Sequence, residues 1–530
     1  MSKEGERKDH MEQNFCIRTR QNGSITLFLA LILTLIFSLF FSLLEAARVQ
    51  ALSQIAKRSL LLELESAFGE YQIGLWENYR LLFLDGSNES HEFDLALLEG
   101  RWMKQAALEQ KGAGFFQMAL KSLEITEYSL ATDNAGAAFE KQACLAIQEQ
   151  LAAGAIDALK QSFQKGERMA EESKDLEQQW DSAKDAMNEA GNFEEQAGDG
   201  ETETSSASDE EQEGTSSVPE KEEVELPDKS DKDLPENPVD AVDLLKKSAI
   251  LAVVVENPSE ISGKSISLQE TLKHRRRAEG NMKSPDRKGL EKLWFLQYLN
   301  HYFACKTGIG KGGSLEHALE YELEYCVAGK DSDQENLEKT VKELLLIREA
   351  GNFATIMQDK VKYALALEIA TAAVGFTGIA PLIQAVQIGI LLAWSYIESI
   401  LDLRCLLSGG KIPLIKQTSE WKSDISLGEE VLVEKKEKTD SQEEGLSYRE
   451  YLQILLLLVG EETLVYRAMD VIEQNIRLQQ PQFRFDHQLY GMQMEGIYAS
   501  ESLFLGFISV AKTKDRTYHF RKSNSYSYLK

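Results

Sequence analysis

A glycine-rich hexapeptide, Gly308-Ile-Gly-Lys-Gly-Gly313, matches the G-x-G-x-x-G pattern that cradles a dinucleotide phosphate. That chemistry requires a strand before the glycines and a helix that opens from them. The preceding residues, LWFLQYLNHYFACK, have the composition of a helix. The hexapeptide also lacks the Gly-Lys-Ser/Thr ending of a phosphate-binding P-loop. We therefore predict a loop here, with Ser314 capping the following helix, and no nucleotide site.

The cysteine and histidine residues do not form a recognisable metal or catalytic pattern. His301 and Cys305 are four residues apart on an expected helix, with His317 and Cys326 nearby, but structural zinc sites use closely spaced ligand pairs that are missing here. The seven histidines are scattered, and no spacing nominates a nucleophile, a base or a cofactor site. We predict no catalytic, cofactor-binding or metal site, no small-molecule substrate and no enzyme. Four cysteines could form two disulfides, and spacing selects no pair: Cys144, Cys305, Cys326 and Cys405.

The overall charge limits the possible partners. The 530 residues carry 86 acidic and 58 basic side chains, a net charge of -28. Nucleic-acid binding requires a basic face, so this balance argues against nucleic acid as a partner. Five cysteines in a chain of this length also exclude a disulfide-dense scaffold.

A membrane anchor is expected near the N-terminus. Residues Ile25 to Leu44 are twenty residues without charge, Gly or Pro, enough to cross the roughly 30 Å hydrocarbon core. A cleaved signal peptide would have a shorter apolar stretch and a small-residue cleavage site. Neither Gly nor Pro occurs from Ser24 to Phe68, which predicts one long helix, with a shorter bent helix as the alternative. Glu45, at the outer boundary, is expected to be a hydrated carboxylate at the headgroups.

Basic residues flank the anchor almost equally, and we expect residues 1–24 to be cytoplasmic and the rest extracytoplasmic. Residues 45–190 should form a mostly helical segment with a strand near Leu123–Ala131 and a solvated, fraying helix over Glu171–Ala190. Residues 191–240 carry 18 acidic residues and 3 lysines with four prolines. They are expected to be a disordered acidic linker.

Residues 241–530 are expected to form a helical domain with strands at its C-terminal end. We predict a strand over Ala249–Glu256, a solvated basic patch over His274–Arg277 and, after Pro481, several strands. The expected strands are Phe483–Phe485, Phe504–Val510 and Tyr518–Phe520. Ser447 and Glu450 have the spacing of a helix capping box.

A second uncharged stretch, Ile369 to Ile397, is 29 residues long and interrupted by Gly378 and Pro381. Each half is too short to span a membrane, so we favour a buried helical hairpin over a second span. The fold class is then α+β and predominantly helical, with an N-terminal transmembrane helix, a few short strands and a disordered linker.

Several stretches carry a resemblance to a known group of proteins. At the N-terminus these are Asn22-Gly-Ser-Ile-Thr-Leu-Phe-Leu-Ala-Leu-Ile-Leu and Leu44-Glu-Ala-Ala-Arg-Val-Gln; further along they are residues 319–329, 344–352, 394–402, 406–413, 466–470 and 525–528. The chain resembles an uncharacterised family encoded with Tad-type (Flp) pilus genes in Gram-positive bacteria. Its N-terminus is similar to the TadE/TadG-like minor pseudopilins.

The resemblance implies a membrane-anchored, single-pass structural or interaction protein, an accessory or minor pseudopilin-like component of a Tad-type pilus or secretion system. Its partners would be the bilayer and other pilin-like membrane proteins. It also implies prepilin-type processing between Gly23 and Ser24. Cutting there places Phe28, not the usual Glu, at the fifth position of the mature chain. The alternative is a two-span membrane sensor or transport accessory, in which Ile369–Ile397 crosses the bilayer.

Overall fold

The structure is a computed structural model. Its described residues are 6–87, 92–109, 114–150, 154–198, 242, 246, 249–286, 291–310, 316–423, 438–504 and 517–529. The prediction of disorder over residues 191–240 is wrong for residues 191–198, which are the end of a helix that reaches Gly198. Residues 199–240 lie outside the described residues, as do Lys311 to Gly313 of the hexapeptide, Ser314 and the part of the expected strand after Phe504.

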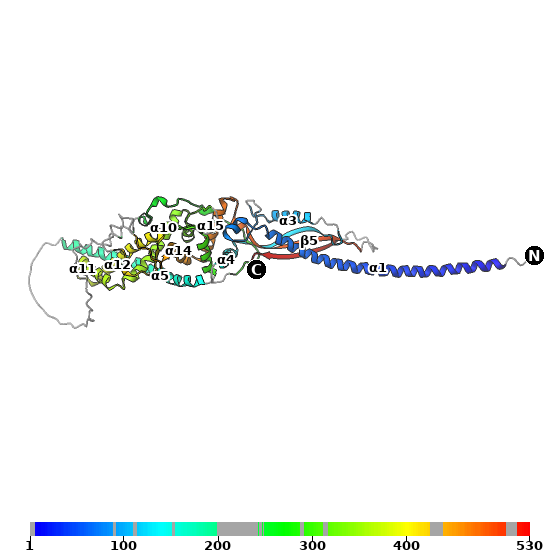
Figure 1. The fold of residues 1–530 in the computed structure, drawn as a ribbon, viewed down its shortest axis with the longest axis horizontal. Helices are drawn as coiled ribbons and strands as arrows, with labels where there is room; N and C mark the ends of the chain where they lie inside the picture. Colours follow the sequence, from blue (N-terminus) through cyan, green and yellow to red (C-terminus); the bar gives the residue numbers. More distant parts are fainter. Residues whose placement is uncertain are drawn as a thin grey trace, which may run out of the picture.

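The first element is one long helix that projects from the rest of the protein (Figure 1). Helix α1 runs over Glu6–Phe68 without interruption, 63 residues or about 95 Å at 1.5 Å per residue. This confirms the long helix predicted from the run without Gly or Pro. Within its Ile25–Phe68 part, an 18-residue stretch has a mean hydropathy of 2.8 and contains no buried residue. The helix is therefore long and apolar enough to cross a membrane.

Four antiparallel strands form the sheet against which α1 ends. They are β1 (Leu84–Asp85), β2 (Ala119–Leu130), β5 (Gln488–Glu501) and β6 (Thr517–Ser527). The central strand is β5: Leu489 pairs with Leu84 of β1 and with Leu130 of β2, while Met492 pairs with Tyr128 of β2 and with Tyr526 of β6. Strand β2 therefore occupies one edge of β5, and β1 and β6 follow each other along the opposite edge.

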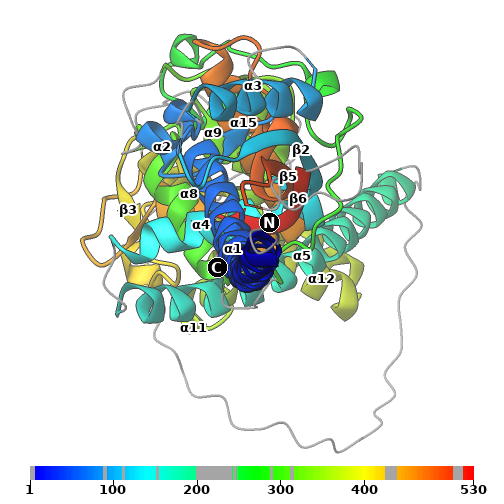
Figure 2. The same cartoon turned by 90° about the vertical axis from the view of Figure 1, so that its right-hand side faces the viewer.

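The C-terminal part of α1 packs on this sheet. Leu52, Ala56, Leu60 and Leu64 recur every four residues and have no exposed surface, so they form one apolar stripe. The stripe shares a core with β5 and with helix α3 (Leu95–Glu109). Figure 2 looks along α1 and shows it beside β5 and β6. One helix therefore has an uncovered apolar half and a half packed on the sheet.

The larger part of the protein is a helical bundle with its own core. The sheet lies between this bundle and the projecting end of α1 (Figure 1). Its longer helices are α4 (Asp133–Gln148), α5 (Gly154–Gly198), α8 (Glu291–Tyr302), α10 (Asp333–Ile356), α11 (Lys360–Val374), α12 (Ala380–Leu407), α14 (Tyr448–Leu458) and α15 (Glu461–Arg477). Shorter helices are α2 (Ile73–Tyr79), α7 (Ile250–Val254) and α9 (Glu322–Ala328), and a two-stranded sheet pairs β3 (Lys411–Ile412) with β4 (Leu446–Ser447). The predominantly helical α+β class is thus confirmed.

The segments on either side of the acidic linker do not pack separately. Strand β2 precedes the linker and pairs along its length with β5, which follows it. Helix α5 also precedes the linker and packs on α10 and α12. The chain therefore leaves the bundle after α5 and returns to the same bundle.

Several local predictions can be compared with the structure. The Ser447–Glu450 capping box is present, and the strands near Leu123–Ala131 and Tyr518–Phe520 are confirmed in β2 and β6. The strand predicted over Ala249–Glu256 is wrong, because Ile250–Val254 is the helix α7. A short apolar run suits a buried helix as well as a strand, and here the run packs on α12. Phe483–Phe485 is not a strand either; both rings pack in the aromatic core and β5 begins only at Gln488.

Glu171–Ala190 is not a fraying, solvated helix. It is the middle of α5, where Met169, Leu176, Ala183 and Ala190 recur every seven residues and are buried. Its sparse apolar residues form a narrow seam against α10 and α12, which a polar composition conceals.

The second uncharged stretch forms the hairpin of α11 and α12, with the turn Gly375–Thr377 and Pro381 in the first turn of α12. By length and composition α12 could also cross a membrane, but 67% of its apolar window is buried inside the protein. This burial favours the hairpin over a second span.

Candidate functional site

The cysteines and histidines considered as possible metal or catalytic residues do not form one site among the described residues. Helix α8 ends at Tyr302, so Cys305 lies in a turn paired with Gly308 and does not share a helical face with His301. His317 contacts Glu322 at 2.8 Å, and this hydrogen bond raises the pKa of the histidine. Cys144, Cys305, Cys326 and Cys405 are buried thiols that form no disulfide with one another. Within the described ranges, no group of three or more His, Cys, Asp or Glu side chains is placed to hold a metal ion.

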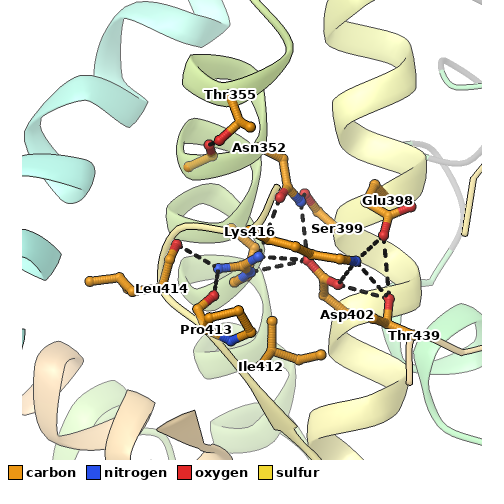
Figure 3. Close-up of polar contacts among 12 residues, drawn as sticks. Asn352, Thr355, Glu398, Ser399, Asp402, Ile412, Pro413, Leu414, Lys416 and Thr439 are labelled. Atoms are coloured by element: carbon orange, nitrogen blue, oxygen red, sulfur yellow. Dashed lines mark hydrogen bonds and ion pairs between the residues drawn. The ribbon is translucent and has the colours of Figure 1, made fainter. Parts of the chain in front are cut away.

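A cluster of four charged side chains without exposed surface lies between α10, α12 and the loop after β3 (Figure 3). Arg348 and Asn352 are one turn apart on α10. Glu398, Ser399 and Asp402 occupy one face of α12, because residues three and four apart are neighbours on a helix. Lys416 completes the set, which we call the buried ionic centre; its members are Arg348, Asn352, Glu398, Ser399, Asp402, Lys416 and Thr439.

Asp402 is bonded on both of its oxygens. Arg348 donates to Oδ2 at 2.7 Å, and Asn352 donates to the same oxygen at 3.1 Å. Lys416 donates to Oδ1 at 2.9 Å, and the Thr439 hydroxyl donates to it at 2.8 Å. Burial alone would raise the pKa of Asp402, but the two adjacent cations hold that pKa below its ordinary value.

The other charges of the centre are also compensated. Lys416 contacts Glu398, whose Oε2 accepts hydrogen bonds from the backbone N–H groups of Lys422 and Ser423 at 3.2 and 2.8 Å. Arg348 donates to the carbonyls of Pro413 and Leu414, each at 2.9 Å. The four charged side chains have no exposed surface and sum to zero.

This arrangement is suited to structure and not to catalysis. The Lys416 Nζ is already occupied by hydrogen bonds to Asp402 and Thr439 and by its contact with Glu398. An enclosed centre with no exposed charge also gives a substrate no access. Its hydrogen bonds instead tie the 413–423 loop and Thr439 to α10 and α12.

A second polar cluster lies on α1 where the exposed apolar half of the helix ends. The Arg48 guanidinium donates to the Phe115 carbonyl at 2.7 Å, the Glu501 carbonyl at 2.9 Å and Ser500 Oγ at 2.8 Å. It also contacts Glu45 at 3.2 Å, and both side chains are 2% exposed. The expectation of a hydrated Glu45 carboxylate is therefore wrong. We call these two residues, with the backbone groups they bind, the α1 junction.

Glu45 takes part in the same junction from the other side. Its Oε2 accepts a hydrogen bond from the Phe504 backbone N–H at 3.1 Å. Because the Glu45–Arg48 pair binds backbone in the loop before β2 and at the end of β5, which pair with each other there, it clamps one end of the sheet to α1. Glu45 directly follows Leu44, the last residue of the expected span, and Arg48 lies one helical turn beyond Leu44.

The predicted N-terminal sites all lie on α1. Gly23 and Ser24 are within the continuous helix, and Ile25 begins the exposed apolar face, which extends to Leu43. The boundary predicted between Leu44 and Glu45 coincides with the change from exposed to buried side chains. Glu45 is the first buried side chain after this exposed face, and the junction begins there.

The basic patch was also expected to be solvated, and at Arg275 this is wrong. Arg275 donates to Glu473 at 2.7 Å and to Asp486 at 2.6 Å, and both carboxylates are almost fully buried. It joins α15 to the turn that precedes β5.

Sequence inspection missed both polar clusters for different reasons. Glu398 and Asp402 interrupt an otherwise apolar helix at a spacing of four, a signal that could have indicated a buried polar face. Lys416 and Ser500 had no such signal, since Lys416 binds side chains at least 14 residues away and Ser500 binds Arg48. Arg48 is three residues from Glu45, but its other acceptors are distant in sequence.

Residues 228–500 match a family described as a family of unknown function (DUF5702). No curated protein and no solved structure matches the chain.

Proposed function

Because the chain belongs to DUF5702, a family of unknown function, we propose its role from its own residues: a single-pass, membrane-anchored structural or interaction protein with most of the chain extracytoplasmic. We further propose that it is an accessory or minor pseudopilin-like component of a Tad-type pilus or secretion system. The structural support for this proposal comes from α1.

The observation that carries the proposal is the division of α1 into two halves. The half that begins at Ile25 leaves its apolar side chains exposed: Leu29 is 66% and Leu35 is 69% exposed. Such a surface requires a bilayer or other apolar helices to cover it. The half after Glu45 is packed on the sheet, so the folded part is held rigidly to the anchor.

The pseudopilin-like role gives the uncovered half two successive environments. In the bilayer it retains the protein, and in an assembly it packs against the apolar helices of other pilin-like subunits. The sequence similarity of residues 22–33 and 44–50 to TadE/TadG-like pseudopilins supports this role, and the exposed apolar face supplies the surface it needs.

Membrane retention can be tested by fractionating cells that produce the full chain. Leu29→Arg combined with Leu35→Arg should move the protein out of the membrane fraction, because each Arg near a span centre costs about 2.5–3.5 kcal/mol. The matched control is Ile55→Arg combined with Leu62→Arg, two exposed residues on the sheet-packed half of the same helix. The anchor is disproved if the first pair stays in the membrane fraction as the control does.

Orientation and the number of spans can be tested together by protease treatment of intact cells. A tag on the N-terminus should be protected and a tag on the C-terminus should be removed. If α12 also crossed the bilayer, both tags would lie on the same side, as the alternative of a two-span sensor requires.

Incorporation and processing need separate measurements. Cysteine at Leu33, which is 50% exposed, should cross-link to a pilin-like partner, whereas cysteine at Leu62 should not. The intact mass of the isolated protein reports processing: removal of residues 1–23 is expected for the natural chain and not for Gly23→Leu. A full-length mass in both proteins would exclude prepilin-type processing.

A further inference from the structure

We propose that an aromatic cluster at the α1 junction inserts into the bilayer interface and docks the sheet onto the lipid surface. We call it the aromatic collar; its residues are Phe41, Phe115, Phe116, Leu503 and Phe504. It deepens the proposed function by naming a second lipid contact, and it rests on α1 being the membrane anchor.

The collar is connected ring by ring to the anchor. Phe41 of α1 stacks on Phe504, with ring centroids 5.6 Å apart and planes 10° apart. Phe504 contacts Phe115 at 5.7 Å, and Phe115 contacts Phe116 at 4.9 Å. Residues more than 380 positions apart in the chain thus form one apolar patch with the expected span.

The position of Phe41 fixes the depth of the patch. Phe41 precedes Leu44 by three residues, which places it about 4.5 Å inside the end of the uncharged segment. When α1 spans the bilayer, side chains that stack on Phe41 must lie at the boundary of hydrocarbon and headgroups. Phe and Leu side chains on the apolar faces of membrane-surface segments insert to about this depth, roughly 5–10 Å into the boundary of headgroups and acyl chains.

Much of the apolar surface of the collar is not covered by the rest of the protein. Phe115 is 44%, Phe116 is 47% and Leu503 is 43% exposed, and they adjoin the exposed face of α1, where Phe40 is 54% exposed. Their exposed surface is continuous with that of the anchor, so the medium that surrounds the anchor also covers them. This continuity selects the lipid bilayer as the partner.

The Glu45–Arg48 pair explains how charges can lie behind this patch. Arg48 holds the Phe115 carbonyl and Glu45 holds the Phe504 N–H, so the pair positions both loops of the collar. Each charge is 2% exposed and compensated by the other, which spares the bilayer an unpaired charge at the boundary. The pair thus positions the collar, and the rings contact the lipid.

The test places an environment-sensitive fluorophore at Phe116 in the full chain. Phe116→Cys is combined with Cys16→Ser, labelled with a nitrobenzoxadiazole maleimide and reconstituted into phosphatidylcholine vesicles. The matched control is Ile73→Cys, a 61% exposed residue at the start of α2, beyond the far end of α1. The chain with Cys16→Ser alone reports any labelling of the buried native cysteines.

We expect blue-shifted emission at Phe116→Cys and its quenching by lipids brominated near the glycerol end of the acyl chain, with neither effect at Ile73→Cys. Leu503→Cys should respond as Phe116→Cys does. Flotation of the vesicles on a density gradient shows whether the protein is bound to them. If the protein floats with the vesicles but the fluorophores at positions 116 and 503 emit as they do in water, the collar is disproved and the anchor is not. Protein that does not float would overturn the anchor and the collar together.

Discussion

Lys416 donates a hydrogen bond of 2.9 Å to Asp402, and neither side chain has any exposed surface. Arg348 bonds the other oxygen of the same carboxylate from α10. Asp402 therefore joins two helices and the loop after β3 through one buried group. A buried charge is tolerated only while its partners remain, so each member of this centre should be sensitive to removal of another.

Lys416→Met should strongly destabilise the protein. It leaves the carboxylates of Glu398 and Asp402 buried with Arg348 as the remaining cation of the centre, and breaking a buried pair costs about 3–5 kcal/mol. Thermal unfolding in detergent, followed by tryptophan fluorescence, should show a clear fall in Tm. The control is Lys422→Met, which removes an exposed lysine paired with Asp440 on the surface and should cost no more than about 1 kcal/mol. Equal losses would contradict the structural role of the centre.

The stability of the bundle should fall as the pH rises from about 5 to about 8. Burial raises the pKa of Glu324 from 4.5 to about 7 and the pKa of Asp470 from 3.8 to about 7. Since folded pKa values above the unfolded ones favour the protonated folded state, their stabilising effect is complete at acid pH. It is lost as the pH rises through the folded pKa.

Glu324→Gln should remove part of this pH dependence. Glu324 Oε1 accepts hydrogen bonds from the Tyr448 hydroxyl and the Lys306 N–H, and an amide oxygen can accept both. A pKa raised from 4.5 to about 7 corresponds to at most about 3.4 kcal/mol, so Tm measured at pH 8 should rise relative to the natural chain while Tm at pH 5 changes little. Glu338→Gln, on the surface of α10, is the control and should leave the slope unchanged. A slope unaffected by Glu324→Gln would exclude that carboxyl as its source.

Sequence alone predicted the features that depend on local pattern. The uncharged run from Ile25 to Leu44 defines the exposed half of α1, and Ser447 with Glu450 gives the start of α14, because spans and caps are encoded within a few residues. The pairing of β2 with β5 could not be predicted, since Leu130 and Leu489 are far apart in the sequence and the composition of a strand does not indicate which strand it pairs with. The same holds for the Arg48 clamp, two of whose acceptors are the backbone carbonyls of Phe115 and Glu501. α7 was missed because five apolar residues fit a helix as well as a strand.

Gly329→Ala should cost more than Gly378→Ala. Both glycines have positive φ, 66° and 68°, which disfavours an alanine by about 1–2 kcal/mol. A Cβ at Gly329 would also meet the Arg467 guanidinium, which donates to the Cys326 and Val327 carbonyls at the end of α9, whereas a Cβ at Gly378 meets open space. The difference between the two Tm changes therefore measures the contact with Arg467. It should vanish when Arg467 is replaced by Ala in both backgrounds, and a difference that persists would assign it elsewhere.

Arg48→Met should loosen the sheet from α1 without removing the anchor. It leaves Glu45 buried without its cation and frees the carbonyls of Phe115 and Glu501, whose hydrogen bonds close the junction. We expect a loss of about 3–5 kcal/mol, seen as a lower Tm of the protein in vesicles, and faster proteolysis near residues 114–117. Arg58→Met, an exposed residue on the sheet-packed half of the same helix, is the control for losing a positive charge. Glu45→Gln in the Arg48→Met background should recover part of the loss, because it removes the uncompensated charge. If Arg48→Met is as mild as Arg58→Met, the clamp does not hold the sheet to the anchor.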